Sequence, residues 1–145
     1  MAEISSSTIT IDAPAQEVQA ILFNIEGYPQ WSTSTKSVAV EVRDDQDRPI
    51  TVKMSIDAGV MRDHVVLEYD WSKAPGEITF SLDDADLLTE MSGGFLITDN
   101  GDETTNVTYS LTVALSMPVP AMMRTKAEKS TIDLALSQLK SALEG

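Results

Sequence analysis

The sequence predicts an α+β fold in which about seven antiparallel strands form a curved sheet around one long C-terminal helix. Three observations support this fold class. Between residues 36 and 117, apolar and polar residues alternate with a period of two, and turn residues interrupt the alternation repeatedly. Helical spacing of apolar residues occurs only near the two ends of the chain. The strands also follow one another without helices between them, which favours an antiparallel meander.

The first structural elements are expected within residues 5–31. Residues 5–12 alternate apolar and polar side chains and predict a strand. A helix should then begin at residues 12–14, because proline suits the first turn and Glu17 lies near the positive end of the helix dipole. Its apolar stripe has helical spacing and comprises Val18, Ile21, Leu22 and Ile25. Residues 27–29 are expected to end this helix, and Trp31 to follow in a short turn or a second helix.

Six further strands are expected before the last helix, separated by turns at residues 44–49, 57–59, 74–76, 83–86 and 100–102. The clearest strand covers residues 107–116, where every second side chain is large and apolar and the others are mainly serine and threonine. This pattern is typical of a sheet with one face on a core and the other in water. The glycine pair Gly93-Gly94 is expected to mark a bulge where the sheet bends.

The C-terminal helix should begin after Pro118 and Pro120 and run for about 25 residues. Its second half carries a continuous apolar stripe: Ile132, Ala135, Leu136, Leu139, Ala142 and Leu143. We expect this half to anchor the helix on the sheet. The first half is more polar on the same face, and we expect it to form a wall of a cavity.

Length and composition restrict the possible classes of protein. The chain has 145 residues, and residues 1–145 are expected to form a single domain. The net charge of −13 argues against binding to nucleic acids or to anionic membranes. No apolar run reaches the roughly 20 residues of a membrane span, and the first ten residues lack the features of a secretion signal. A cytoplasmic protein is therefore expected.

The order of elements, together with several short motifs, resembles the START-like superfamily. The motifs are Ile11-Asp12-Ala13-Pro14, Tyr28-Pro29-x-Trp31, Gly94-Phe95-x-Ile97, Val107-x-Tyr109 and Leu136-x-x-Leu139. The nearest branch is similar to the polyketide cyclase/dehydrase and coenzyme Q-binding group. The resemblance covers nearly the whole chain and implies a helix-grip fold with a cavity between the sheet and the last helix. Members of the superfamily include lipid carriers, receptors, cyclases, quinone-binding proteins, cochaperones and a toxin, so the fold alone does not select a function.

Strand parity and helix periodicity assign the side chains that should face this cavity. The candidate ligand-binding residues are Trp31, Met54, Met61, Asp63, Tyr69, Leu82, Met91, Phe95, Tyr109, Met122, Thr125 and Glu128. Methionines adapt to irregular apolar ligands, and tyrosines combine an apolar ring with a hydroxyl. Most of these residue types are also common in ordinary cores, which remains the competing interpretation.

Three functions are consistent with this pattern. The leading hypothesis is binding of a hydrophobic or amphipathic small molecule, such as a lipid, quinone or polyketide-like compound. The first alternative is a metal-independent cyclase or dehydratase acting on a polyketide-like substrate, which would need an acid and a base within the cavity. The side chains that could serve are Asp63, Tyr69, Tyr109 and Glu128. Asp63 could be a base or a ligand anchor, unless it is solvated at the rim. The second alternative is a protein-interaction module, cochaperone-like or ribosome-associated, which would need an exposed apolar patch.

Metal and nucleophilic chemistry find little support in the sequence. There is no cysteine, and His64 is the only histidine, expected on the outer face of its strand. The acidic residues Asp83, Asp84 and Asp86 lack the spacing of a calcium loop and are expected in a solvated turn. No metal or cofactor is therefore expected, whereas the ligand and the oligomeric state stay open.

Overall fold

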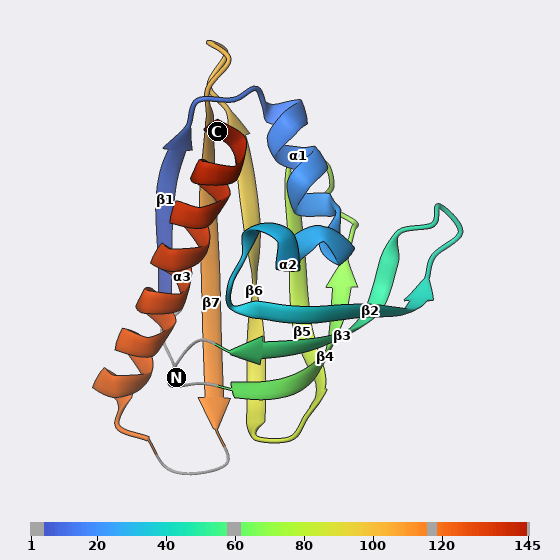
Figure 1. The fold of residues 1–145 in the computed structure, drawn as a ribbon, viewed down its shortest axis with the longest axis vertical. Coiled ribbons are helices and arrows are strands. Elements are labelled where there is room, and N and C mark those ends of the chain that lie inside the picture. The colour runs from blue at the N-terminus through green and yellow to red at the C-terminus, as the bar shows by residue number, and fades with distance from the viewer. Residues whose placement is uncertain (1–4, 58–61, 116–118, 145) are drawn as a thin grey trace.

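A computed structural model describes residues 5–57, 62–115 and 119–144 of the chain. The elements are β1 (Ser5–Ile11), α1 (Ala15–Phe23), a 3₁₀ turn (Ile25–Gly27), α2 (Tyr28–Trp31), β2 (Thr35–Arg43), β3 (Pro49–Asp57), β4 (Arg62–Asp70), β5 (Glu77–Ala85), β6 (Leu88–Asp99), β7 (Thr105–Leu115) and α3 (Ala121–Glu144). All three α-helices lie on one face of a curved sheet (Figure 1). This arrangement confirms the predicted α+β helix-grip fold.

The sheet has the strand order β1-β7-β6-β5-β4-β3-β2, and every neighbouring pair is antiparallel. Strands β2 to β7 therefore form the expected meander. The first strand joins the last one, with Ser5 opposite Leu111 and Ile11 opposite Thr105. The pairing of β1 with β7 places β1 beside α3, as Figure 1 shows.

The region between β1 and β2 differs from the sequence prediction at one point. Helix α1 ends at Phe23, and Tyr28 and Pro29 begin α2 rather than end α1. Proline fits this position because the first turn of a helix needs no donated hydrogen bond. The Tyr28 hydroxyl donates a hydrogen bond to the carbonyl oxygen of Leu22 at 2.5 Å, which ties α2 to α1.

The glycine pair in β6 does not form a bulge, so that prediction was wrong. The pairing of β6 with β7 is regular through Gly93 and Gly94, and its register shift lies between Leu88 and Glu90 instead. A Cβ atom on Gly93 would lie 2.0 Å from the carbonyl oxygen of Ser110. The glycines are therefore explained by close approach of neighbouring backbones in the curved sheet. The turn predicted at residues 83–86 also begins later than expected, because β5 continues to Ala85.

The core lies between the concave face of the sheet and the helices. The second half of α3 buries Ile132, Leu136 and Leu139 against it, which confirms the predicted anchor. These side chains follow the helical repeat of three to four residues, so they share one face.

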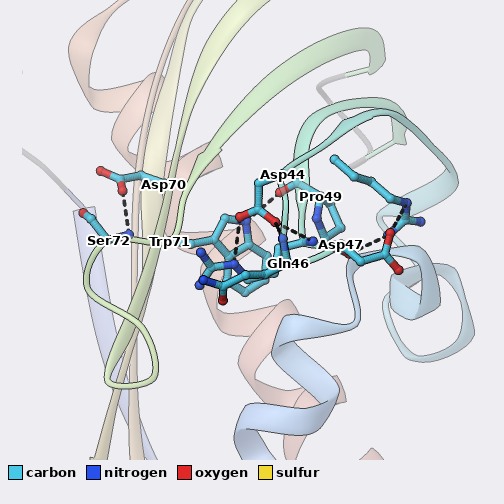
Figure 2. Close-up of polar contacts among 9 residues, drawn as sticks. Asp44, Gln46, Asp47, Pro49, Asp70, Trp71 and Ser72 are labelled. Carbon is cyan, nitrogen blue, oxygen red and sulfur yellow. Dashed lines mark hydrogen bonds and ion pairs between the residues drawn. The ribbon is translucent and has the colours of Figure 1, made fainter.

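Trp71 fixes the turn between β2 and β3 to the end of β4 (Figure 2). Its indole Nε1 donates a hydrogen bond to the carbonyl oxygen of Pro49 at 2.6 Å, and the Arg48 guanidinium lies 5.5 Å from the centre of its ring system. Asp44 accepts hydrogen bonds from the backbone N–H groups of Gln46 and Arg48, both at 2.9 Å. Trp71 is thus held in a structural role away from the cavity described below.

Candidate functional site

A cavity of about 60 Å³ lies between the concave face of the sheet, α2 and α3. Its lining comprises Tyr28, Trp31, Ser32, Ser34, Thr35, Met54, Ile56, Leu67, Tyr69, Phe80, Met91, Phe95, Tyr109, Thr131 and Ala135. Six of the eight aromatic side chains of the chain are in this set. The site is therefore predominantly aromatic.

Strand alternation brings these side chains together from distant parts of the sequence. Leu67 and Tyr69 are two residues apart on β4, so both point to the concave face. Phe95 of β6 lies opposite Tyr109 of β7, and their rings stack with centroids 4.4 Å apart. Such ring pairs contribute about 0.5 to 1.5 kcal/mol beyond the area they bury. The aromatic wall is therefore part of the core as well as of the cavity.

The lining contains no charged side chain among the described residues. Among the described lining residues, the groups that titrate are the phenols of Tyr28, Tyr69 and Tyr109. Burial raises the pKa of each phenol above the ordinary value of 10.0. All three therefore stay neutral over the physiological range.

The three hydroxyls differ in their hydrogen bonding. That of Tyr28 is used in the bond to Leu22. Those of Tyr69 and Tyr109 have no hydrogen-bond partner within the described ranges.

Helix α3 contributes to the cavity from its middle, through Thr131 and Ala135. The expectation that its first half forms the wall was wrong: Met122 is 82% exposed and Thr125 is also exposed. The buried residues of α3 begin only at Glu128, so its first turns contribute no wall to the cavity.

Glu128 is buried but is not part of the lining. It is 2% exposed, and its carboxylate accepts hydrogen bonds from the Ser5 hydroxyl and from the Val113 backbone N–H, both at 2.7 Å. These bonds tie α3 to β1 and β7. Since both carboxylate oxygens already have partners, the structure gives Glu128 a structural role.

Asp63 also lies outside the cavity. Its side chain is buried, yet it points to the connection between β5 and β6. One oxygen accepts hydrogen bonds from the backbone N–H groups of His64 and Asp86, and the other from those of Leu87 and Leu88, at 2.7 to 3.1 Å. Four donors satisfy the carboxylate, so neither the solvated-rim expectation nor the base or anchor role fits this geometry.

Of the twelve candidate residues, the structure brings six together around the cavity: Trp31, Met54, Tyr69, Met91, Phe95 and Tyr109. Leu82 is half-buried and lies two residues beyond Phe80 on β5, outside the lining. Met61 lies outside the described residues. Strand parity could have identified Ile56, Leu67 and Phe80, because they share faces with assigned neighbours. No periodic signal marks Ser32 and Ser34, which come from the connection between α2 and β2, or Thr35, the first residue of β2.

Two larger depressions, of about 500 and 470 Å³, are bordered by exposed polar side chains. His64 borders both, its side chain is 78% exposed, and its Nδ1 lies 3.3 Å from an oxygen of Asp86. The outward position predicted for His64 is confirmed. The described ranges contain no group of three or more side chains suited to hold a metal ion. Within the same ranges, no helix has the length and apolar character needed to cross a membrane.

Comparisons with solved structures show the same fold. A START superfamily protein from Mycobacterium smegmatis is similar with a TM-score of 0.91 and 23% identity, over 97% of each chain. A protein from Thermus thermophilus gives a TM-score of 0.80 and 18% identity over 98% of this chain and 97% of the other. The Zhui aromatase/cyclase from Streptomyces sp. R1128 gives 0.71 and 16%, over 98% of this chain and 89% of the other.

The family comparison is more direct than these structural likenesses. No sequence among the curated proteins matches the chain. The profile of the family described as "Polyketide cyclase / dehydrase and lipid transport" matches residues 1–144. The chain therefore belongs to this polyketide cyclase/dehydrase and lipid transport family.

Proposed function

We propose that the protein binds an apolar or amphipathic small molecule in the cavity between the sheet, α2 and α3. The observation that carries this proposal is the lining, in which six aromatic side chains occur and no charged one does among the described residues. Small-molecule sites are typically apolar and aromatic with a few polar groups, and this cavity follows that pattern. The family description, which includes lipid transport, supports the same class of ligand.

The size of the cavity adds a requirement. Its 60 Å³ is about the volume of two water molecules, whereas small-molecule sites usually have 300 to 1,000 Å³. Binding therefore requires the walls to move apart. Met54 and Met91 can change shape at low cost because their side chains are unbranched.

The seam between α3 and the connection from α2 to β2 is where we propose that the cavity opens. Thr33 and Gln138 join the two segments: the Thr33 backbone N–H donates to Gln138 Oε1 at 3.0 Å, and Gln138 Nε2 donates to the Thr33 hydroxyl at 2.8 Å. Both bonds are exposed, so water can replace them when the segments separate. Opening at this position leaves the buried stripe of α3 in place.

Binding is favoured over the cyclase alternative by the chemistry of the lining. The Zhui protein and the protein BexL, both similar in fold, are described as aromatase/cyclases. A cyclase of the expected kind needs an acid and a base near the substrate. Here Asp63 and Glu128 are engaged elsewhere, and burial raises the pKa of the lining tyrosines, which keeps them protonated, so they cannot act as bases, and makes them weaker acids.

A fluorescence titration with N-phenyl-1-naphthylamine, a neutral apolar probe, tests the proposal. We expect emission of the probe to rise on binding to the wild-type protein, and Ala135→Leu to abolish the rise by filling the cavity from α3. Ala142→Leu is the matched control, because Ala142 is exposed and borders a separate groove of about 210 Å³. Absence of wild-type binding, or loss of binding only in the Ala142 variant, would contradict the proposal. Thermal unfolding of both variants verifies that they fold.

A further inference from the structure

Two phenol hydroxyls of the cavity stand out because they lack a protein partner among the described residues. Tyr69 and Tyr109 are each 7% exposed, and neither hydroxyl makes a hydrogen bond within the described part of the chain. Neither oxygen is among the fully buried side-chain atoms that lack a partner in the described residues, so both hydroxyls are accessible from the cavity that their side chains line. Tyr28, in the same cavity, shows the usual arrangement through its bond to Leu22.

Both hydroxyls belong to side chains that line the cavity. Tyr69 belongs to β4 and Tyr109 to β7. The fold, rather than proximity in sequence, therefore brings the two hydroxyls to the same cavity. Aromatic neighbours hold both rings in place. The ring centroids of Tyr69 and Phe80 are 5.7 Å apart, and the ring of Tyr109 stacks on that of Phe95. A fixed ring holds its hydroxyl in place, as a ligand-binding donor requires.

The surroundings decide which oxygen or nitrogen the hydroxyls can bind. Burial keeps both phenols protonated by raising the pKa of each. Each can therefore donate to an acceptor oxygen. Within the described lining there is no arginine, lysine or histidine to balance a carboxylate or phosphate, and no acidic side chain to balance an amine. Moving a charged ligand from water into this site would have a large uncompensated cost.

We propose that Tyr69 and Tyr109 anchor the ligand through its oxygen atoms, and that the ligand is a neutral ring compound bearing a carbonyl or hydroxyl group. This inference rests on the proposed function, because it concerns the same cavity. The aromatic walls supply the contact area for the ring, and the two phenols supply orientation. Charged lipids, fatty acids and amines are excluded from this class.

Three probes of similar ring structure test the inference: naphthalene, 2-acetylnaphthalene and 2-naphthoate. We expect 2-acetylnaphthalene to bind the wild-type protein about tenfold more tightly than naphthalene, which corresponds to one net hydrogen bond. The anion 2-naphthoate should bind at least tenfold more weakly than the ketone of similar size. In the Tyr69→Phe/Tyr109→Phe double variant, the preference for the ketone over naphthalene should be lost. Ala142→Leu, at an exposed residue outside the lining, should retain it.

The outcomes separate this inference from the proposed function. If naphthalene and the ketone bind equally to the wild-type protein, or if 2-naphthoate binds best, the inference is wrong although a binding cavity exists. If the double variant keeps the ketone preference, the anchors are wrong. If none of the probes binds, both proposals fail.

A second measurement needs no ligand. Removing a cavity-facing hydroxyl that lacks a protein partner should not destabilise the protein, whereas removing a bonded one should. We therefore expect Tyr69→Phe and Tyr109→Phe to leave the melting temperature unchanged or to raise it, and Tyr28→Phe to lower it. A decrease at Tyr69 or Tyr109 as large as that at Tyr28 would show that the hydroxyl has a structural partner, and would overturn its assignment as an anchor.

Discussion

The carboxylate of Glu128 accepts a hydrogen bond of 2.7 Å from the backbone N–H of Val113, and this bond ties α3 to the strand that carries Tyr109. The second oxygen of Glu128 accepts from the hydroxyl of Ser5. A buried carboxylate thus joins α3, β1 and β7 at the point where the helix leaves the sheet. The arrangement resembles the way in which Asp63 holds the connection between β5 and β6.

Glu128→Ala should lower the free energy of unfolding by about 2 to 3 kcal/mol, because it leaves the Val113 N–H without a partner in a buried position. Glu128→Gln should cost less. Its amide oxygen can accept from Val113, and its amide nitrogen can donate to the Ser5 hydroxyl. Urea unfolding of the three proteins measures the difference. Equal losses in both variants would show that the charge, rather than the hydrogen-bond geometry, stabilises the contact.

Asp63→Asn should lower the free energy of unfolding by about 2 kcal/mol, because an amide nitrogen would replace an oxygen that accepts from backbone N–H groups. Asp84→Asn is the control at an exposed position of β5, and its effect should stay within about 0.5 kcal/mol. Chemical denaturation gives both values. A variant of Asp63 with wild-type stability and altered probe binding would instead point to a role in the site.

The two halves of α3 should respond differently to truncation. Leu136→Ala and Leu139→Ala should each cost about 2 to 5 kcal/mol, because both side chains are buried in the core. Thr125→Ala should cost little, because Thr125 is exposed. Equal destabilisation at the three positions, measured by thermal and urea unfolding, would mean that the anchor of the helix is misplaced.

Stability should fall at alkaline pH. Burial raises the pKa of Tyr28, Tyr69 and Tyr109 above 10.0, so the unfolded chain releases these protons first and the folded chain keeps them. Their contribution is fully present below about pH 10 and is lost as the pH rises towards the folded-state values. With three such groups, the loss approaches about 4 kcal/mol per pH unit above that point.

Urea midpoints measured between about pH 8 and about pH 11 test this dependence. The double variant Tyr69→Phe/Tyr109→Phe should show a shallower loss, because two of the three groups are removed. A stability that does not change over this interval would mean that the phenols ionise in the folded protein.

Gly93→Ala should destabilise the sheet strongly, by about 3 kcal/mol or more, because the new methyl group would lie 2.0 Å from the Ser110 carbonyl oxygen. Backbone cannot yield as the end of a flexible side chain can. Gly76→Ala is a suitable control, since its Cβ would meet only the Lys73 carbonyl oxygen, at 3.9 Å. Comparable melting temperatures for the two variants would contradict the close packing of β6 against β7.

The sequence alone determined the fold class and the anchor of the last helix. The period of two from residue 36 onward, and the stripe through Ile132 and Leu139, depend only on which side chains share a face. That property follows from local backbone geometry, which repeats along the chain. For the same reason strand parity correctly assigned Met54, Tyr69, Met91, Phe95 and Tyr109 to the concave face.

The tertiary structure decided where along each face the cavity lies. Parity placed Asp63 and Tyr69 on the same side of β4, yet only Tyr69 reaches the cavity. Asp63 lies near the start of β4, where the connection between β5 and β6 supplies its hydrogen-bond donors. Periodicity likewise grouped Thr125 with the buried face of α3, but Thr125 is exposed, because the buried residues of this helix begin only at Glu128. Parity fixes the direction of a side chain, whereas the partner that it meets depends on residues far away in sequence, and only the packed chain brings these together.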